Sequence, residues 1–592
     1  MATAAAALVQ LVAYGAAFLP PKLDSKHESK PDFKKRDQGF GTTWLKALCS
    51  PPAFCLALAA VLVAGRWEWL EVDRPLNPDE GLWLANAWRY TPDMVPWRAT
   101  SSGTSGPLTP WLLTLLGFCG APLDYATAHA VAMGLQIAVV GLAYGTIRIV
   151  CGESPGRLAT MPAALLLSRT GHPDFVHLSS ENVPLVLMAG CGCAAAYGLQ
   201  GGVAECRRRW WLLFAGVLAG AVPFAKLQAV PMALVMSCVI ATAAMVTSSS
   251  RQNRLARLIS FGSGGCVVPI AIVGLVWWAG FFGDMWHMYV DGCLAYGNPS
   301  ASERTYATRV SCLIWDSPVF LTLSATVFAT TATAVFGCVV LGWGGTERFG
   351  RWLLFAAAVY LTTGFFCVAK PGHHFPHYLM LLTLPLMLLS GTALQMILSA
   401  QPQRLWSAVG VVLACVAPLV VLSRCGLGGS CFVEGAAYDR VLAGLVQMPP
   451  TAEAGVVANL SDPDDEVAVW GAWRSDIYIE ARRRPAVRDV ELSGAIVPGP
   501  FRDYSRLRFL EDMQRNRPRL FVDAVCYAGF PANDWQVFGQ EIVERRLGGH
   551  ETFAELGEFV SRHYVRRAQV FKGPNGSGGS VRVYERRDAV PR

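Results

Sequence analysis

Asp79 and Glu80 are adjacent carboxylates in the stretch Asn77-Pro-Asp-Glu-Gly81, which follows the first long apolar segment of the chain. A carboxylate within hydrogen-bond reach of a hydroxyl group can take its proton while the oxygen attacks another group, so this pair suggests general acid–base chemistry. The competing explanation is structural, because acidic residues in the first turn of a helix are stabilised by the helix dipole. The apolar and aromatic spacing of residues 81–90 predicts such a helix, lying in a membrane interface.

Two further polar segments lie between apolar runs. Lys370-Pro-Gly-His373-His374-Phe-Pro-His377 holds one lysine and three histidines, which are donors for a phosphate or ligands for a metal. The segment from His172 to Asn182 contains Glu181. Ionisable residues near membrane depth are costly and tend to be functional, although a single loop histidine is often an ordinary hydrogen-bonding residue.

The composition places these segments in a membrane protein. Of the 592 residues 53% are hydrophobic and 16% are charged, and the mean hydropathy is +0.35. Apolar runs of about 17 to 25 residues are long enough to cross a bilayer. Eleven such runs are predicted as transmembrane helices, near 47–65, 124–147, 158–172, 183–204, 210–225, 227–247, 258–283, 317–342, 352–369, 378–399 and 405–423. The third and fifth are the weakest.

Lysine and arginine near the span ends predict the orientation, because they prefer the cytoplasmic side. Lys22, Lys26, Lys30, Lys34, Lys35 and Arg36 precede the first span. Further arginines fall in alternate loops: Arg148, Arg157, Arg207 to Arg209, Arg251, Arg254, Arg257, Arg348, Arg351 and Arg404. The N-terminus is therefore expected inside, and the loops that carry Asp79, His172 to Asn182 and Lys370 to His377 outside. These arginines also explain the net charge of +7, which does not argue for nucleic-acid binding.

We expect three parts: a cytoplasmic tail at 1–43, a transmembrane domain at 44–424 with an outer loop at about 67–123, and an extracytoplasmic α/β domain at 425–592. In the last part charged residues return, and short apolar strands such as Val467–Trp470 and Leu520–Val522 alternate with helical stretches. No nucleotide-binding glycine fingerprint occurs in the sequence, which argues against an ATP-driven pump or a Rossmann-type nucleotide-sugar transferase.

The order of the polar segments resembles that of the GT-C superfamily of membrane glycosyltransferases, in particular bacterial relatives of the dolichyl-phosphate-mannose protein mannosyltransferases and of the lipid A aminoarabinose transferases. The likeness rests on Asn77 to Gly81, Ser105-Gly-Pro-Leu-Thr-Pro-Trp111, His172 to Asn182 and His373 to Leu379, with Phe224 to Ala229 as a weaker match. These segments span most of residues 44–424 in the order that the superfamily shows.

This resemblance implies a polytopic α-helical membrane protein of the bacterial inner (plasma) membrane that transfers a sugar, with inversion, from a polyprenyl-phosphate donor to a protein, lipid or glycan acceptor on the outer face. It implies that Asp79 is the general base, with Glu80 as the second catalytic carboxylate. Glu181 and His172 would orient the acceptor, or hold a divalent metal whose presence stays open. The candidates for binding the lipid phosphate are Lys370, His373, His374, His377, Lys226, Arg89 and Arg309.

One motif departs from the family pattern. The first outer loop reads Ser105-Gly-Pro-Leu, where aminoarabinose transferases resemble Lys-Pro-Pro-Leu, so an aminoarabinose donor is in doubt. Two other classes remain open from the sequence. A secondary transporter would be expected to show an internal repeat and charges within its spans, and a non-catalytic sensor or assembly module would leave the carboxylates without a role.

Overall fold

The structure is a computed structural model that describes residues 50–101, 103–170, 172–248, 250–296, 306–315, 324, 327–328, 330–335, 348–373, 375–399, 449–496, 500–525, 553–571 and 580–589. The predicted N-terminal tail, the predicted span at 405–423 and most of the predicted span at 317–342 lie outside these residues. His374 lies outside them as well.

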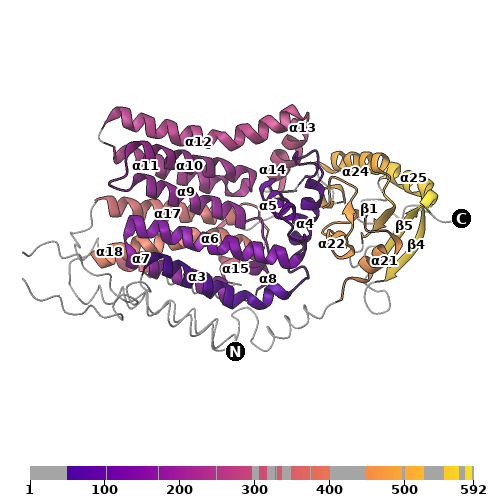
Figure 1. Cartoon of the computed structure of the whole chain (residues 1–592), viewed down its shortest axis with the longest axis horizontal. Coiled ribbons are helices and arrows are strands. Elements are labelled where there is room, and N and C mark those ends of the chain that lie inside the picture. The colour runs from indigo at the N-terminus through magenta and orange to yellow at the C-terminus, as the bar shows by residue number, and fades with distance from the viewer. Residues whose placement is uncertain are drawn as a thin grey trace, which may run out of the picture.

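Long helices run side by side in one bundle (Figure 1). They are α3 (Pro51–Arg66), α6 (Tyr125–Cys151), α7 (Glu153–Arg169), α9 (Asn182–Leu199), α10 (Glu205–Ala221), α11 (Val230–Val246), α12 (Arg251–Trp278), α17 (Arg348–Ala369) and α18 (Thr383–Ser399). Each corresponds to one predicted span. Among the described residues, seven helical segments are long and apolar enough to cross a membrane. Helices α7 and α10 are not among these seven, so a polytopic helical membrane protein is confirmed while the total of eleven stays a prediction.

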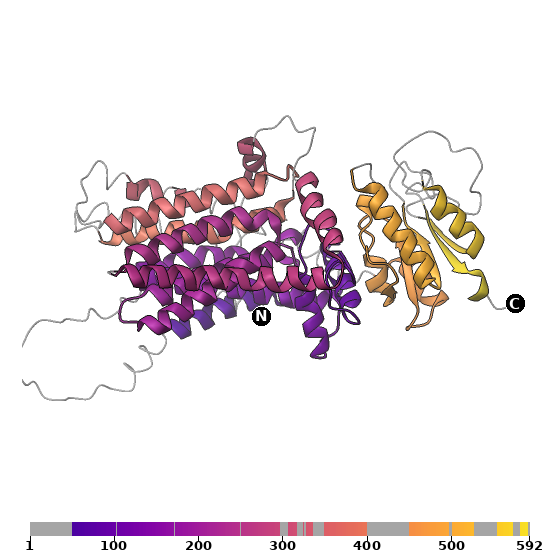
Figure 2. The same cartoon turned by 90° about the horizontal axis from the view of Figure 1, so that it is seen from above.

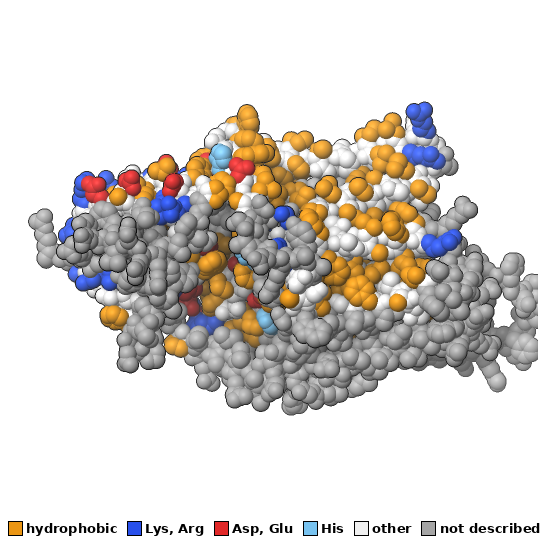
Figure 3. Space-filling view, turned by 180° about the vertical axis from the view of Figure 1, so that it is seen from behind, with side chains coloured by type: hydrophobic (Ala, Val, Ile, Leu, Met, Phe, Trp, Pro, Cys, Tyr) orange, Lys and Arg blue, Asp and Glu red, His pale blue; other side chains and the backbone are white. Residues whose placement is uncertain are grey.

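The surface of the bundle fits this assignment. In Figure 3 hydrophobic side chains cover most of its visible described surface, and lysine and arginine gather at the end away from the C-terminal part. Helices α10 and α12 begin at that end, and they carry Arg207 to Arg209, Arg251 and Arg254. The basic loops expected on the cytoplasmic side therefore share one end of the bundle.

Short elements cover the opposite end (Figures 1 and 2). They are η1 (Trp67–Glu71), α4 (Pro78–Tyr90), α5 (Leu108–Phe118), α8 (Pro173–Val176), α13 (Phe282–Asp284), η4 (Met285–Asp291), α14 (Gly292–Tyr296), α15 (Tyr306–Trp315) and η5 (Pro376–Leu382). The loops predicted to share the outer face therefore meet at one end. The alternating loop pattern of the sequence predicts this grouping, whichever side of the membrane that end faces.

Lys226 lies in a break between two helices of the bundle. Helix α10 ends at Ala221, and two short turns, η2 (Val222–Phe224) and η3 (Leu227–Ala229), precede α11. Pro223 and Pro231 lack the backbone N–H that a continuous helix would need, so the chain unwinds between them. Lys226 itself is extended, with φ −160° and ψ 122°. An unwound segment at membrane depth is tolerated where protein surrounds it.

The described residues between 449 and 589 form a C-terminal domain with a five-stranded sheet in the order β2-β1-β3-β5-β4. The strands are β1 (Glu466–Trp470), β2 (Arg484–Pro485), β3 (Leu520–Asp523), β4 (Tyr564–Phe571) and β5 (Ser580–Arg586). Strand β1 pairs in parallel with β2 and β3, while β5 pairs antiparallel with β3 and β4. The helices are α21 (Ala452–Leu460), α22 (Asp476–Ala481), α23 (Ser493–Ile496), α24 (Arg502–Asn516), α25 (Ala554–His563) and η9 (Arg587–Ala589).

This domain packs directly on α4 and contacts α13. The Arg508 side chain forms an ion pair with Asp284 and another, at 3.0 Å, with Asp489 of its own domain. Ser101 Oγ donates a hydrogen bond to Asp489 Oδ1 at 2.5 Å. A Cβ atom built on Gly81 would lie 3.1 Å from the backbone nitrogen of Asp476, so only glycine allows this approach without a shift. The start of α4 is thus held between the bundle and the C-terminal domain.

Candidate active site

Asn77 sets the position of Asp79. Its side-chain oxygen accepts a hydrogen bond from the Asp79 backbone N–H at 3.0 Å and caps α4, and Pro78 occupies the first helical turn, where proline is well tolerated. The Asn77 amide also donates to Asp174 Oδ1 at 3.0 Å. The capping role is therefore filled by Asn77. In the described part of the chain, no hydrogen bond or ion pair engages the partly buried Asp79 carboxylate.

Glu80 has a different environment from Asp79. It is fully buried, at 0% exposure, and its two oxygens accept hydrogen bonds from the backbone N–H groups of Leu76 and Leu178, both at 2.9 Å. His129 Nε2 lies 3.1 Å from Glu80 Oε1. Burial opposes ionisation, but His129 holds the pKa of Glu80 below its usual value. Glu80 therefore joins η1, α4, α6 and the loop after α8, which favours a role in positioning over contact with a substrate.

Asp174 links three segments that are distant in the sequence. Besides Asn77, it contacts His377, whose Nδ1 lies 3.3 Å from Asp174 Oδ2. Burial opposes ionisation here too, yet the hydrogen bond from His377 and the charge of His177 hold the pKa of Asp174 well below its usual range. His172 caps α8, with Nδ1 accepting from the Asp174 backbone N–H at 3.2 Å. Asp174 thus orients His377, and His172 shapes the loop.

A second polar chain begins at Glu181 and ends at His373. The buried Lys226 ammonium group forms an ion pair with Glu181 and donates to Ser180 Oγ at 2.6 Å. It also lies 5.0 Å from the centre of the Tyr378 ring. The hydroxyl groups of Tyr378 and Tyr296 are 3.2 Å apart, and the Tyr296 ring stacks on His373 with centroids separated by 4.3 Å.

The negative charges of Asp79 and Glu181 both affect the pKa of Tyr296. Burial is the main cause that raises the pKa of Tyr296 to about 12. The hydrogen bond with Tyr378 opposes the rise, and the negative charges of Asp79 and Glu181 add to it. The two carboxylates therefore lie within electrostatic reach of one phenol group. Asp79, from the first outer loop, and Glu181, from the second, therefore both lie near Tyr296.

Basic residues lie near His373, whose ring stacks on Tyr296. Arg309 Nη1 donates to the Ala369 carbonyl group at 3.2 Å. Burial, with the charge of Arg309, lowers the pKa of His373. Lys370 follows directly after α17, and no described residue pairs with its ammonium group. Arg309, Lys370 and His373 therefore form a basic cluster beside the carboxylates.

Arg89 lies apart from this cluster. It is near the other end of α4, where its guanidinium group donates to the carbonyl groups of Ala99 and Pro485 at 3.2 and 3.1 Å. These bonds join α4 to the C-terminal domain. The site predicted from the sequence therefore assembles around Asp79, Glu181, Lys226 and His377, while Arg89 serves the contact between the two parts.

The described residues do not offer a ready metal centre. Among them, no three His, Cys, Asp or Glu side chains are grouped closely enough to hold a metal ion. Glu181 is paired with Lys226, and Asp174 is shared between Asn77 and His377. A metal held by Asp79, Glu181 and a histidine would require Lys226 to leave Glu181.

Three residues of the site were not identified from the sequence. Asp174 lies inside a segment that was singled out, but its contact with His377 joins positions 203 residues apart. Tyr296 and Tyr378, which meet through their hydroxyl groups, are separated by 82 residues. Spacing along one helix or loop carries no signal for such contacts. A tyrosine directly after His377 was the one local hint.

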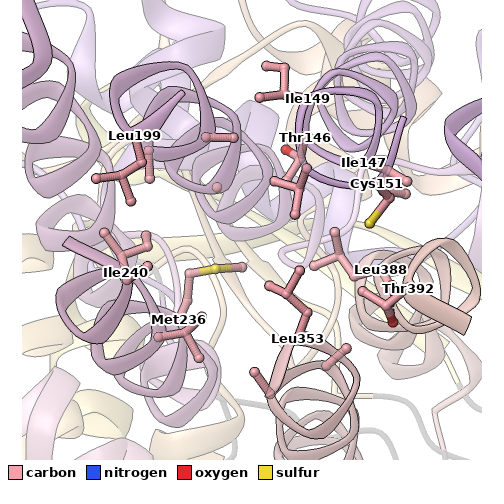
Figure 4. A pocket seen from close by; sticks show the side chains of 18 of the residues that line it. Thr146, Ile147, Ile149, Cys151, Leu199, Met236, Ile240, Leu353, Leu388 and Thr392 are labelled. Carbon is pink, nitrogen blue, oxygen red and sulfur yellow. Dashed lines mark hydrogen bonds between the residues drawn. The ribbon is translucent and has the colours of Figure 1, made fainter. Parts of the chain in front are cut away.

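A cavity of about 270 Å³ lies among α6, α9, α11, α17 and α18 (Figure 4). Its lining is almost wholly apolar and includes Ile147, Leu199, Met236, Ile240 and Leu388. Ile147 and Leu199 belong to the ends of α6 and α9 that point away from Asp79. This cavity therefore lies apart from the carboxylates and carries no group that could do their chemistry.

Comparison with known proteins identifies the fold. No protein-family model and no curated protein sequence matches the chain. Among solved structures, ArnT from Cupriavidus metallidurans in the apo state is similar, with a TM-score of 0.50, 14% sequence identity and coverage of 94% of this chain and 100% of that one. The chain has a GT-C fold.

Two further structures are similar to the chain. ArnT from the same organism, bound to undecaprenyl phosphate, gives a TM-score of 0.50 at 11% identity, covering 93% of this chain and 100% of that one. The archaeal oligosaccharyltransferase AglB from Archaeoglobus fulgidus, in complex with an inhibitory peptide and a dolichol-phosphate, gives 0.43 at 11% identity, covering 93% and 75%. The likeness to the two ArnT structures shows the fold alone, and the predicted GT-C architecture is confirmed.

Proposed function

We propose that the chain is an inverting glycosyltransferase, which moves a sugar from a polyprenyl-phosphate donor to an acceptor hydroxyl group on the outer face of the membrane. The observation that carries this proposal is the contrast among the carboxylates at one end of the bundle. Glu80, Asp174 and Glu181 are each held by donors, whereas no described residue engages Asp79. A positioned carboxylate with no partner is suited to take the proton of an acceptor.

The second half of the reaction needs positive charge. The leaving group is a lipid phosphate that is already anionic, so N–H donors and cations stabilise it better than an acid would. Arg309, Lys370 and His373 form such a group near Tyr296. The ArnT structure with undecaprenyl phosphate, which shares the fold, supports a donor of this chemical class.

Inversion is expected when one carboxylate acts as a base and no carboxylate acts as a nucleophile. A retaining reaction requires a second carboxylate or another nucleophile close to the sugar. Glu80 is occupied by backbone N–H groups, Asp174 by Asn77 and His377, and Glu181 by Lys226. Asp79 acting as a base in a single displacement therefore fits best, with Glu80 and Asp174 as positioning residues.

In this proposal the end of the bundle that carries Asp79 faces outward, and residues 425–592 form an extracytoplasmic domain. The N-terminus is then cytoplasmic, and the enzyme lies in the inner membrane with its donor dissolved in the bilayer. The common position of the basic loops, at the opposite end, supports this orientation.

The test is transfer by the purified full-length protein in detergent. A panel of radiolabelled polyprenyl-phosphate sugars is offered together with protein, lipid and glycan acceptors. We expect release of the polyprenyl phosphate with formation of a labelled acceptor of inverted anomeric configuration. Movement of a labelled solute across proteoliposomes, without turnover of any donor, would favour a transporter instead.

A further inference from the structure

A cavity of about 260 Å³ lies where the start of α4 meets the C-terminal domain. Asn77 and Pro78 line it on the membrane side, and Trp473, Arg474 and Asp476 line it on the side of the domain. Arg474 and Asp476 form an ion pair with each other at 3.0 Å. The cavity therefore lies between Asn77, which caps the Asp79 helix, and the C-terminal domain. Its aromatic lining residues are Tyr125 and Trp473.

Trp473 has an unusual conformation for a tryptophan. Its backbone φ is +51°, in the left-handed region that bulky residues rarely adopt, and its side chain is 47% exposed. An exposed hydrophobic residue is common by itself. An exposed residue that is also strained does not gain the packing that would offset its strain, and such residues gather at binding sites.

Glu491 is hydrogen-bonded to the backbone of Trp473. Its carboxylate accepts hydrogen bonds from the Trp473 backbone N–H at 3.3 Å and from the N–H and hydroxyl groups of Ser493 at 2.8 and 2.6 Å. Burial, with the negative charge of Asp79, raises the pKa of Glu491. The cavity that Trp473 lines is also lined by Asn77 and Pro78, which directly precede Asp79 in the chain, and the Glu491 carboxylate is bound to the Trp473 backbone.

An aromatic face next to a carboxylate matches one class of molecule. A sugar ring has an apolar face of C–H groups, which stacks on an indole, and hydroxyl groups at its edge, which donate to carboxylates. A pocket that combines an aromatic wall with a few placed polar groups selects such a ligand by shape and by orientation. A lipid acceptor would instead require an apolar groove that continues into the bilayer.

We propose that the acceptor is a carbohydrate, held on the C-terminal domain by the Trp473 indole and the Glu491 carboxylate so that one of its hydroxyl groups reaches Asp79. This inference rests on the proposed function and names the class of acceptor at the same site. It also gives the C-terminal domain a direct part in binding, as one wall of the active site.

The test uses full-length protein in detergent and a panel of neutral oligosaccharides, with binding measured by saturation-transfer difference NMR. Trp473→Gly is the main variant, because glycine adopts φ near +50° without strain and the fold is retained. We expect wild type to bind at least one oligosaccharide. We expect Trp473→Gly to weaken that binding at least tenfold without lowering the melting temperature, and Glu491→Gln to weaken it several-fold. Trp278→Ala, which truncates an 81% exposed tryptophan at the end of α12, is the control and should bind as wild type does.

A separate readout distinguishes the two proposals. Release of polyprenyl phosphate from the donor and binding of undecaprenyl phosphate are measured in the same variants, and we expect Trp473→Gly to bind undecaprenyl phosphate as wild type does. Donor turnover without binding of any oligosaccharide, or oligosaccharide binding that Trp473→Gly leaves unchanged, would overturn the carbohydrate inference alone. Loss of donor turnover in wild type would overturn the proposed function itself.

Discussion

Asp79, Glu80, Asp174 and Glu181 are four carboxylates with four different surroundings, and the surroundings separate their roles. Glu80 is closed off from solvent by backbone N–H groups and His129. Asp174 holds His377, and Glu181 neutralises Lys226. Because the fold has satisfied these three, a negative charge available for chemistry remains at Asp79.

Asp174 gives a prediction about pH. Its folded-state pKa is depressed, so it contributes stability that is present above the unfolded value of about 3.9 and is lost as the pH falls below it. We expect the melting temperature of the wild type in detergent to fall more steeply between pH 5 and pH 3 than that of Asp174→Asn. Equal slopes for the two proteins would show that Asp174 gains nothing from its partners.

The sequence predicted Asp79, Glu181, Lys226 and His377 as site residues because each lies in a polar segment between apolar runs, and their roles stay predictions. It could not separate Asp79 from Glu80. Adjacent residues in a helix point in directions about 100° apart, so Glu80 faces His129 while Asp79 points elsewhere. The directions of Asp79 and Glu80 depend on packing against α6 and α8, and the spacing of nearby residues in the sequence does not predict that packing.

At the scale of elements, the break between α10 and α11 is the feature that presents Lys226. Gly106, in the Ser105-Gly-Pro motif, packs against this break: its N–H donates to the Ala225 carbonyl group at 3.0 Å. A Cβ atom on Gly106 would lie only 2.0 Å from the Phe224 carbonyl oxygen. Close packing therefore explains the glycine of this motif. Gly106 lets the first outer loop contact the segment that carries Lys226.

Gly106→Ala is expected to push these two segments apart, because the Phe224 carbonyl group is backbone and cannot rotate away. We expect a loss of about 1–3 kcal/mol in stability, measured by thermal unfolding in detergent, together with weaker binding of undecaprenyl phosphate. Gly134→Ala in α6 is the matched control, since no atom lies within 4 Å of the added methyl group. If Gly106→Ala behaved like Gly134→Ala, the packing argument would be wrong.

The helices were easier to predict from the sequence than the breaks between them. Long charge-free runs located the helices of the bundle, and alternating arginines predicted which ends share a face. The break at Lys226 was visible in the sequence only as a weak boundary, because its two prolines lie directly beside apolar helices. Pro223 follows the end of α10, and Pro231 lies in the first turn of α11. Turns that satisfy their backbone groups through tertiary packing leave little trace in a hydropathy pattern.

At the scale of the whole molecule, Arg508 fastens the C-terminal domain to the helical part. Burial would lower its pKa, but Asp489 and Asp284 raise that pKa, so the guanidinium group stays charged. Its Nη2 also donates to the Trp97 carbonyl group at 3.4 Å. Three segments therefore meet at one buried cation. Removing the partner of a buried charge typically costs about 3–5 kcal/mol, which makes this contact a sensitive point.

Arg508→Met should loosen the domain without unfolding the sheet. We expect faster hydrogen exchange at residues 97–101 and 284–289, detected by mass spectrometry, and slower sugar transfer, because the wall formed by Trp473 is no longer fixed. Arg502→Met, on the same helix, removes a partly exposed arginine whose nearest carboxylate is 3.7 Å away. That control should exchange as wild type does, and equal exchange in both variants would refute the fastening role.

The measurement that tests the central claim most directly is the single-turnover rate of sugar transfer by wild type and Asp79→Asn, with donor binding measured separately for each protein. If Asp79 takes the proton of the acceptor, the substitution should slow the chemical step by about 10²–10⁴-fold while the donor dissociation constant and the melting temperature stay unchanged. A rate within a few-fold of wild type, with donor bound equally well, would contradict the account and move the search for the base to another residue.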